Sequence, residues 1–207
     1  MRTKWFLAAL VGVLLLLGQS DGIARQQEQS AAQNGEANDN AGEAARIIKG
    51  FQIAPVPLNL RGKNVALVGL GSYIVNAQGG CNDCHTFPPY AAGGDPFAGE
   101  PKKVNAERYL AGGTPFGPPG DPNTPVSRNL TPRASNGLPA NLTWEQFLRT
   151  IRTGADLKHR PPFAPSEDND LLQVMPWPVF QDMTDRDLRA IYEYLRSIPS
   201  LPSTPTP

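Results

Sequence analysis

The chain has 207 residues, of which 40% are hydrophobic and 18% charged, and its 19 basic residues balance 19 acidic ones. This length favours one domain of ordinary size with extensions, and zero net charge removes the simplest argument for nucleic-acid binding, which needs a basic excess. The 22 prolines and 20 glycines predict long loops, and 2 cysteines are too few for a disulfide-rich scaffold.

Residues 1–24 have the pattern of a secretory signal peptide. Arg2 and Lys4 precede an apolar run from Trp5 to Leu17, which is short for a membrane span. Small residues place cleavage after Ser20 or after Ala24, and an uncleaved N-terminal anchor is the alternative. We therefore expect export to the periplasm or the outer face of the cytoplasmic membrane. Membrane association is expected only through an uncleaved signal.

Residues 25–45 form a polar tract whose only apolar residues are alanines. Such a composition cannot bury enough surface to offset the entropy of ordering, so we expect a flexible linker. The predicted globular domain spans residues 46–201, and residues 202–207 are a proline-rich tail.

The globular part begins with an apolar helical pattern at residues 63–77, where apolar residues recur at i, i+3, i+4 and i+7. Gly69 and Gly71 weaken a helix, but they are useful where another backbone must approach closely. The alternative is a strand leading into a dinucleotide-binding turn. Position 74 should then be the third glycine but is Ile74, and no βαβ unit follows, so we favour the helix.

Two further helices are predicted downstream. Residues 143–153 begin with a capping box of Thr143 and Gln146, and Gly154 is a stop signal. Residues 184–197 begin at Thr184, with acidic residues in the first turn and the same apolar spacing.

Before these helices, residues 86–142 contain eleven prolines and eight glycines. A loop of that length is unusual inside a compact domain, and a large buried prosthetic group would organise it.

The sequence Cys81-Asn82-Asp83-Cys84-His85 matches C-x-x-C-H, the attachment signature of c-type haem. Two thiols three residues apart on a helical turn can both reach the vinyl groups of one haem, and the adjacent histidine can donate Nε2 to the iron. Three other kinds of site also use cysteine pairs. They are a thioredoxin-like C-x-x-C, which needs a preceding strand, a plain structural cysteine pair, and a zinc site, for which only His159 is available as a fourth Cys or His ligand.

A sixth iron ligand would be a methionine or histidine far downstream. We expect it to be Met175, because Pro176 biases this residue away from helix and an extended segment can present a thioether. A core-filling role for Met175 is the alternative. Met183 is expected to pack against Leu188, and His159 lies in a basic run whose usual place is in solvent.

These motifs resemble the cytochrome c family, in particular its single-haem members and the cytochrome subunits of periplasmic dehydrogenases. The resemblance covers about residues 65–198 and is carried by GSYIVNAQGGCNDCHT, YLAGGTPFG, RNLTP, TWEQFLRTIRTG and MPWPVFQDMTDRDLRAIYEYLRSIP. It implies an all-α, cytochrome c-like fold with long Pro/Gly-rich loops around a covalently bound haem. The first and last helices would cross, with Gly71 facing Tyr192 or Leu195. Dehydrogenase subunits of this kind often carry three haem motifs, and this chain has one.

The resemblance also implies a function. One haem c would be attached at Cys81 and Cys84, with His85 as the proximal and Met175 as the distal iron ligand. The protein would pass single electrons from a dehydrogenase or other donor to a respiratory acceptor, an oxidase or membrane complex. It would be a carrier or a dehydrogenase subunit rather than a stand-alone enzyme. The alternatives are a haem-c enzyme or gas sensor with an open sixth iron position, and an exported C-x-x-C thiol oxidoreductase.

Overall fold

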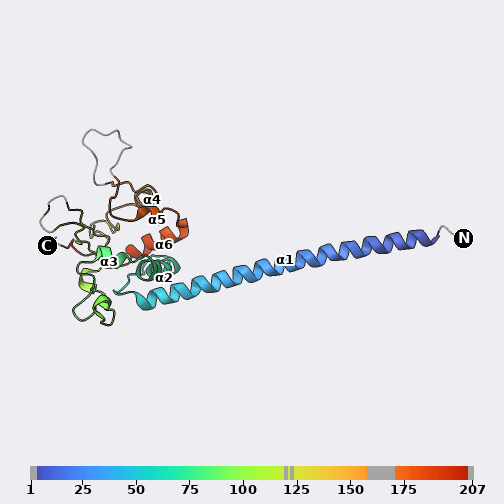
Figure 1. The fold of residues 1–207 in the computed structure, drawn as a ribbon, viewed down its shortest axis with the longest axis horizontal. Coiled ribbons are helices and arrows are strands. Elements are labelled where there is room, and N and C mark those ends of the chain that lie inside the picture. Colours follow the sequence, from blue (N-terminus) through green and yellow to red (C-terminus); the bar gives the residue numbers. More distant parts are fainter. Residues whose placement is uncertain (1–3, 119–120, 122–123, 158–170, 205–207) are drawn as a thin grey trace, which may run out of the picture. The chain divides into compact units, whose positions relative to one another are not determined.

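The computed structural model describes the chain apart from residues 1–3, 119–120, 122–123, 158–170 and 205–207, and for residues 4–24 it describes the backbone alone. The described residues form α-helices with short 3-10 and π turns and contain no strand, so the predicted all-α class is confirmed (Figure 1). The chain divides into two compact units, Met1–Ala45 and Arg46–Pro207.

Helix α1 (Lys4–Ile53) makes up the first unit and continues into the second. Residues 25–45 are helical with almost entirely exposed side chains, whereas their composition predicts a flexible linker. Alanine, glutamine and glutamate are good helix formers. The prediction of a flexible linker considered only how much surface the tract can bury and left out this helix preference. The leader and linker boundaries remain predictions. Where side chains are described, no helix is long and apolar enough to cross a membrane.

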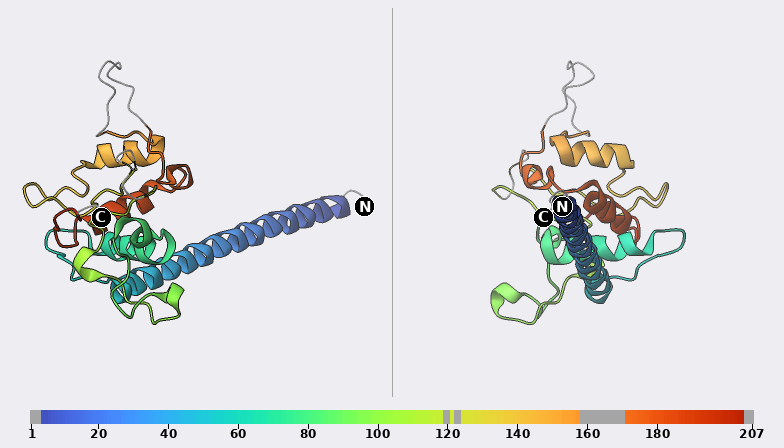
Figure 2. Two further views of the ribbon diagram at one scale, coloured as in Figure 1. Left: turned by 60° about the vertical axis from the view of Figure 1, so that its left-hand side comes forward. Right: turned by 90° about the vertical axis from the view of Figure 1, so that its right-hand side faces the viewer.

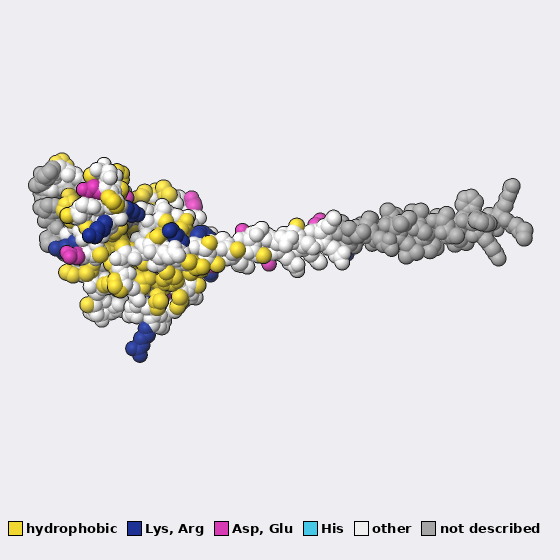
Figure 3. Space-filling view, turned by 90° about the horizontal axis from the view of Figure 1, so that it is seen from below, with side chains coloured by type: hydrophobic (Ala, Val, Ile, Leu, Met, Phe, Trp, Pro, Cys, Tyr) yellow, Lys and Arg dark blue, Asp and Glu magenta, His cyan; other side chains and the backbone are white. Residues whose placement is uncertain are grey.

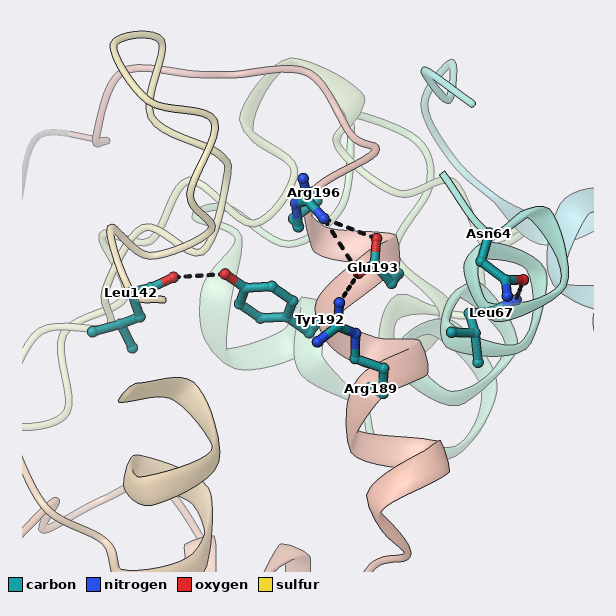
Figure 4. Close-up of polar contacts among 7 residues, drawn as sticks. All are labelled: Asn64, Leu67, Leu142, Arg189, Tyr192, Glu193 and Arg196. Carbon is teal, nitrogen blue, oxygen red and sulfur yellow. Dashed lines mark hydrogen bonds and ion pairs between the residues drawn. The ribbon is translucent and has the colours of Figure 1, made fainter. Parts of the chain in front are cut away.

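Helix α2 (Val65–Tyr73) confirms the helix predicted at 63–77, and a π turn, η1 (Ile74–Gln78), replaces its last part. The Asn64 side chain caps α2 by accepting a hydrogen bond of 3.1 Å from the Leu67 N–H (Figure 4). Gly69 and Gly71 both lie inside α2. The dinucleotide-turn alternative is therefore wrong, because it required a strand at this place.

Helix α6 (Asp185–Leu195) crosses α2, and the two helices lie side by side in Figures 1 and 2. A Cβ at Gly71 would overlap the Ala190 carbonyl oxygen and lie 2.8 Å from the Tyr194 Cβ. The crossing on Gly71 is as expected, but Tyr192 and Leu195 were the wrong partners. Ala190 and Tyr194, four residues apart, form the face of α6 that meets α2, and the small Ala190 lets the backbones approach.

The last turns of α1, which belong to the second unit, pack on the other side of α2. A Cβ at Gly50 would overlap the Gly69 carbonyl, and a Cβ at Gly69 would lie 2.7 Å from a methyl of Ile47. Ser72 Oγ donates a hydrogen bond of 2.7 Å to the Gly50 carbonyl. Helix α2 is therefore held between two helices through glycine contacts.

Helix α4 (Trp144–Thr153) begins with the predicted capping box of Thr143 and Gln146 and ends at Gly154 in the left-handed region. Trp144 and Phe147 place their rings 5.6 and 5.4 Å from the ring of Tyr192 on α6. The Tyr192 hydroxyl donates to the Leu142 carbonyl at 2.9 Å, just before α4 (Figure 4). This aromatic cluster explains why Tyr192 faces α4 rather than α2.

Residues 86–142 connect the motif helix α3 (Cys81–His85) to α4. They contain the 3-10 turns η2 (Pro96–Ala98) and η3 (Ala106–Arg108), and isolated bridges such as Thr86 with Gly112.

The core of the second unit is formed by apolar side chains from these loops and from the helices: Val56, Val68, Val75, Tyr109, Leu110, Phe147, Ile151, Leu188, Tyr192, Tyr194, Leu195 and Ile198. Hydrophobic side chains also cover much of the face shown in Figure 3, with charged ones between them.

Candidate functional site

A cavity of about 730 Å³ lies in the second unit, and all four residues singled out from the sequence line it: Cys81, Cys84, His85 and Met175. The structure thus brings Met175 to the same cavity as a motif about ninety residues earlier in the chain. Most of the remaining lining is apolar, including Val75, Phe116, Leu130, Leu142, Phe147, Ile151, Leu172, Phe180, Leu188, Ile191 and Leu195. The volume is in the range of roughly 300–1,000 Å³ that is usual for cofactor sites.

The two cysteines lie on the single helical turn α3, which follows Gly80 in the left-handed region (φ 58). Both thiols are free; Cys81 is half-buried and Cys84 exposed. Burial raises the pKa of Cys81 to about 12 and also raises the pKa of Cys84. A thioredoxin-type nucleophile needs the opposite shift. The thiol oxidoreductase alternative also requires a strand before the motif, whereas the described residues there are helical.

The ring of His85 is oriented by the backbone. Its Nδ1 lies 2.8 Å from the Arg128 carbonyl oxygen, which can only accept, so Nδ1 carries the hydrogen. Burial lowers the pKa of His85, although the Arg128 hydrogen bond opposes this shift, so the ring is neutral at pH 7. A neutral imidazole with Nδ1–H bonded to a carbonyl has Nε2 available as a metal ligand.

A second loop segment fixes the backbone around His85. The Gly112 N–H donates to the His85 carbonyl at 2.7 Å, and the Leu110 N–H donates to Thr86 Oγ1 at 2.9 Å. Leu110 is fully buried and has a φ of 56, a strained value for a leucine. Such strain persists only where the surrounding structure enforces it, as these hydrogen bonds do here.

Arg128 and Asp156 also line the cavity and were missed by sequence reasoning. Their side chains form an ion pair of 2.5 Å, and the Asp156 side chain is only 8% exposed. A carboxylate this deeply buried needs such a partner. Arg128 is the first residue of the RNLTP run, and nothing in the sequence marks its carbonyl as the acceptor for His85.

The segment carrying Met175 is tied to the end of α4 at its start and closes into a local turn after Met175. The Leu172 N–H donates to the Gly154 carbonyl at 2.8 Å, and the Trp177 N–H donates to the Met175 carbonyl at 2.7 Å. The chain then enters a short helix, α5 (Trp177–Phe180). The predicted extended segment is therefore not found: residues 173–175 bend, and α5 follows. A proline in a first helical turn is tolerated because its fixed φ suits the helix.

Of the other candidate ligands, Met183 is half-buried and is not among the described lining residues. It packs against the core described above and against a second buried cluster of Leu70, Ile74 and Ala190. His159 lies outside the described residues. Among the residues that the structure describes, no three His, Cys, Asp or Glu side chains are grouped as a metal site.

Comparison with known proteins finds no matching family model and no matching solved structure. The chain is 30% identical over 131 residues to the gluconate 2-dehydrogenase cytochrome c subunit of Pantoea cypripedii, covering 63% of this chain and 23% of that protein. It is also 30% identical over 135 residues to the cytochrome c subunit of the alcohol dehydrogenase (quinone) of Gluconobacter oxydans, covering 65% and 24%. The chain is related to the cytochrome c family. It spans about a quarter of the length of these curated relatives.

The cavity fits the prosthetic group of a cytochrome c. Imidazole and thioether are the donor pair that holds the iron of such haem, and the cavity offers one of each together with two thiols. The apolar lining suits a large, flat hydrophobic ring. The neutral His85, oriented by a carbonyl, is in the protonation state that iron ligation requires.

Proposed function

We propose that the chain is an exported single-haem c-type cytochrome that passes one electron at a time from a dehydrogenase or other donor to a respiratory acceptor. The observation that carries this proposal is that Cys81, Cys84, His85 and Met175 all line one and the same apolar cavity. Haem iron held there would exchange one electron between Fe(II) and Fe(III).

Each of the four residues has a role in this proposal. Cys81 and Cys84 would form the two thioether bonds that attach the haem. His85 Nε2 would be the proximal ligand, held in one orientation by the Arg128 carbonyl. The Met175 sulfur would be the distal ligand. The apolar side chains around them would shield the haem from water, and burial with a thioether ligand would favour Fe(II) and a raised reduction potential.

The partners are proposed from the same comparison. Both relatives are named as cytochrome c subunits of dehydrogenases. We therefore favour a role as an electron carrier or a dehydrogenase subunit, docked to a donor dehydrogenase and to an oxidase or membrane complex. Export to the periplasm is proposed from the basic and apolar pattern of residues 1–24.

The decisive experiment is a haem stain on a denaturing gel, with the chain produced in a host that attaches haem to exported cytochromes. Only covalently bound haem survives denaturation, so the unmodified chain should stain and the Cys81→Ala/Cys84→Ala variant should not. An unstained chain would contradict the proposal. A stained chain with a five-coordinate absorption spectrum would instead support the haem enzyme or gas sensor with an open sixth position.

A further inference from the structure

The turn after α4, Gly154–Asp156, lies between the two segments that carry the proposed iron ligands. On the distal side, the Gly154 carbonyl accepts the Leu172 N–H at 2.8 Å. The Trp177 indole lies against the same residue, since a Cβ at Gly154 would be 2.5 Å from Trp177 Nε1. Leu172 and Trp177 flank Met175, so one glycine contacts both ends of its segment.

The other end of this turn reaches the proximal side. Asp156 is buried and pairs with the Arg128 guanidinium at 2.5 Å. The carbonyl of Arg128 is the acceptor, at 2.8 Å, for His85 Nδ1. The turn is therefore joined to the residue that orients His85, as well as to the segment of Met175.

The turn is itself fixed to the rest of the molecule. The Gly154 N–H donates to the Thr150 carbonyl at 2.9 Å and closes the C-terminal end of α4. Arg152, two residues earlier, binds the Gln181 carbonyl and the Asp185 carboxylate at the start of α6. A turn held at a capped helix end can act as a rigid spacer between two walls of a cavity.

We propose that Gly154 and Asp156 are positioning residues whose turn sets the separation of His85 and Met175. This inference rests on the proposed function. Metal ligands must be held to within about 0.5 Å of their working geometry by the residues around them. A displacement of the turn would therefore weaken the iron–thioether bond while leaving the covalent attachment at Cys81 and Cys84 intact.

The distal contact is tested by Gly154→Ala against Gly137→Ala. The two glycines have φ values of 71 and 69, but nothing lies within 4 Å of a Cβ at Gly137. Both substitutions impose the same backbone strain, and only Gly154→Ala pushes on Trp177. We expect Gly154→Ala to lower the reduction potential and to raise the affinity of the oxidised protein for added imidazole at least tenfold, with Gly137→Ala unchanged. Trp177→Leu, which removes the indole, should act in the same direction if Gly154→Ala does not fold.

The proximal contact is tested by Asp156→Asn against Glu193→Gln. The Glu193 side chain is 6% exposed and pairs with Arg189 at 2.9 Å and Arg196 at 3.2 Å (Figure 4). Glu193 is not among the described residues that line the cavity. Both substitutions neutralise a buried carboxylate that forms an ion pair with arginine. We expect only Asp156→Asn to raise imidazole affinity, whereas Glu193→Gln should change the free energy of unfolding alone.

Equal imidazole affinities within either pair would overturn the inference, because the turn would then not act on both ligands. If the unmodified chain has no covalent haem, the proposed function fails and this inference fails with it. If haem is attached and the paired affinities are equal, only this inference fails. The two failures are therefore distinguishable by the haem stain.

Discussion

At the scale of single residues, a closed ring of hydrogen bonds lies behind the motif. The Tyr109 hydroxyl donates its one hydrogen to Asn76 Oδ1 at 2.6 Å. The Tyr194 hydroxyl must therefore be the donor in its 2.9 Å hydrogen bond with the Tyr109 hydroxyl. Asn76 Nδ2 donates to the Tyr194 hydroxyl at 3.1 Å and completes the ring. Each phenol thus donates once and accepts once, and Asn76 places the ring on the π turn that leads to Cys81.

Removing one hydroxyl should leave buried partners unsatisfied. We expect Tyr109→Phe to lower the free energy of unfolding by about 1–3 kcal/mol. Tyr73→Phe is the matched control, because Tyr73 is half-buried on α2 and outside this ring, and a substitution away from such features changes stability by within about 0.5 kcal/mol. Urea unfolding of both variants measures the difference, and equal losses would contradict a special role for the ring.

The same phenols predict how stability depends on pH. Burial raises the pKa of Tyr109 well above 10.0 and also raises the pKa of Tyr194. The unfolded chain therefore loses these protons first, and the stabilisation is complete below pH 10 and is lost as the pH rises beyond it. Urea titrations between pH 8 and 11 should show this fall in the free energy of unfolding. The fall should be shallower in Tyr109→Phe, and an equally steep fall there would count against the assignment.

The two methionines should respond differently to truncation. Met175→Ala should keep covalent haem, lose the weak red-end band that marks methionine–iron ligation, and lower the reduction potential, because the thioether favours Fe(II). Met183→Ala should cost packing only, on the order of 2 kcal/mol, since Met183 packs against the core and against the second buried cluster of Leu70, Ile74 and Ala190. Redox titrations and oxidised-state spectra of both variants test this. The reverse pattern would make Met183 the distal ligand and Met175 a packing residue.

At the scale of elements, short-range sequence signals were enough to predict the helices. They were not enough to predict which residues of different helices touch. The capping box of Thr143 and Gln146 was predicted correctly because cap and helix lie within four residues. The partner of Gly71 was not, because the register of a helix crossing depends on which face of α6 the aromatic cluster leaves free. The His85 acceptor is a backbone carbonyl 43 residues away, which has no side-chain signature in the sequence.

The crossing of α2 and α6 predicts a large effect of one methyl group. Gly71→Ala would place a Cβ on the Ala190 carbonyl, and overpacking of this kind typically costs about 1–3 kcal/mol. Gly35→Ala is the control, because nothing lies within 4 Å of its Cβ and alanine is the better helix former. Thermal melts of both variants should show a lower midpoint for Gly71→Ala alone. An unchanged midpoint would mean that the helices can separate without cost.

At the scale of the whole molecule, the second unit is built around a cavity of about 730 Å³ and long loops. A group that binds only the folded state adds its binding free energy to folding. The variant Cys81→Ala/Cys84→Ala should therefore lose most of the folded product as well as the haem. Far-UV circular dichroism and melting of the purified variant test this, and an apoprotein with full helix content and cooperative melting would contradict it.

The glycine contact between α1 and α2 also decides where the chain can be shortened. Gly50 lies close against Gly69, and its carbonyl accepts the buried Ser72 hydroxyl at 2.7 Å. A chain that starts at Arg46 keeps this contact. A chain that starts at Pro55 would expose the back of α2 and leave Ser72 without its acceptor. The globular unit thus needs the last turns of α1, which precede α2, the first core helix predicted from the sequence. A trimmed protein should therefore be cut before residue 46.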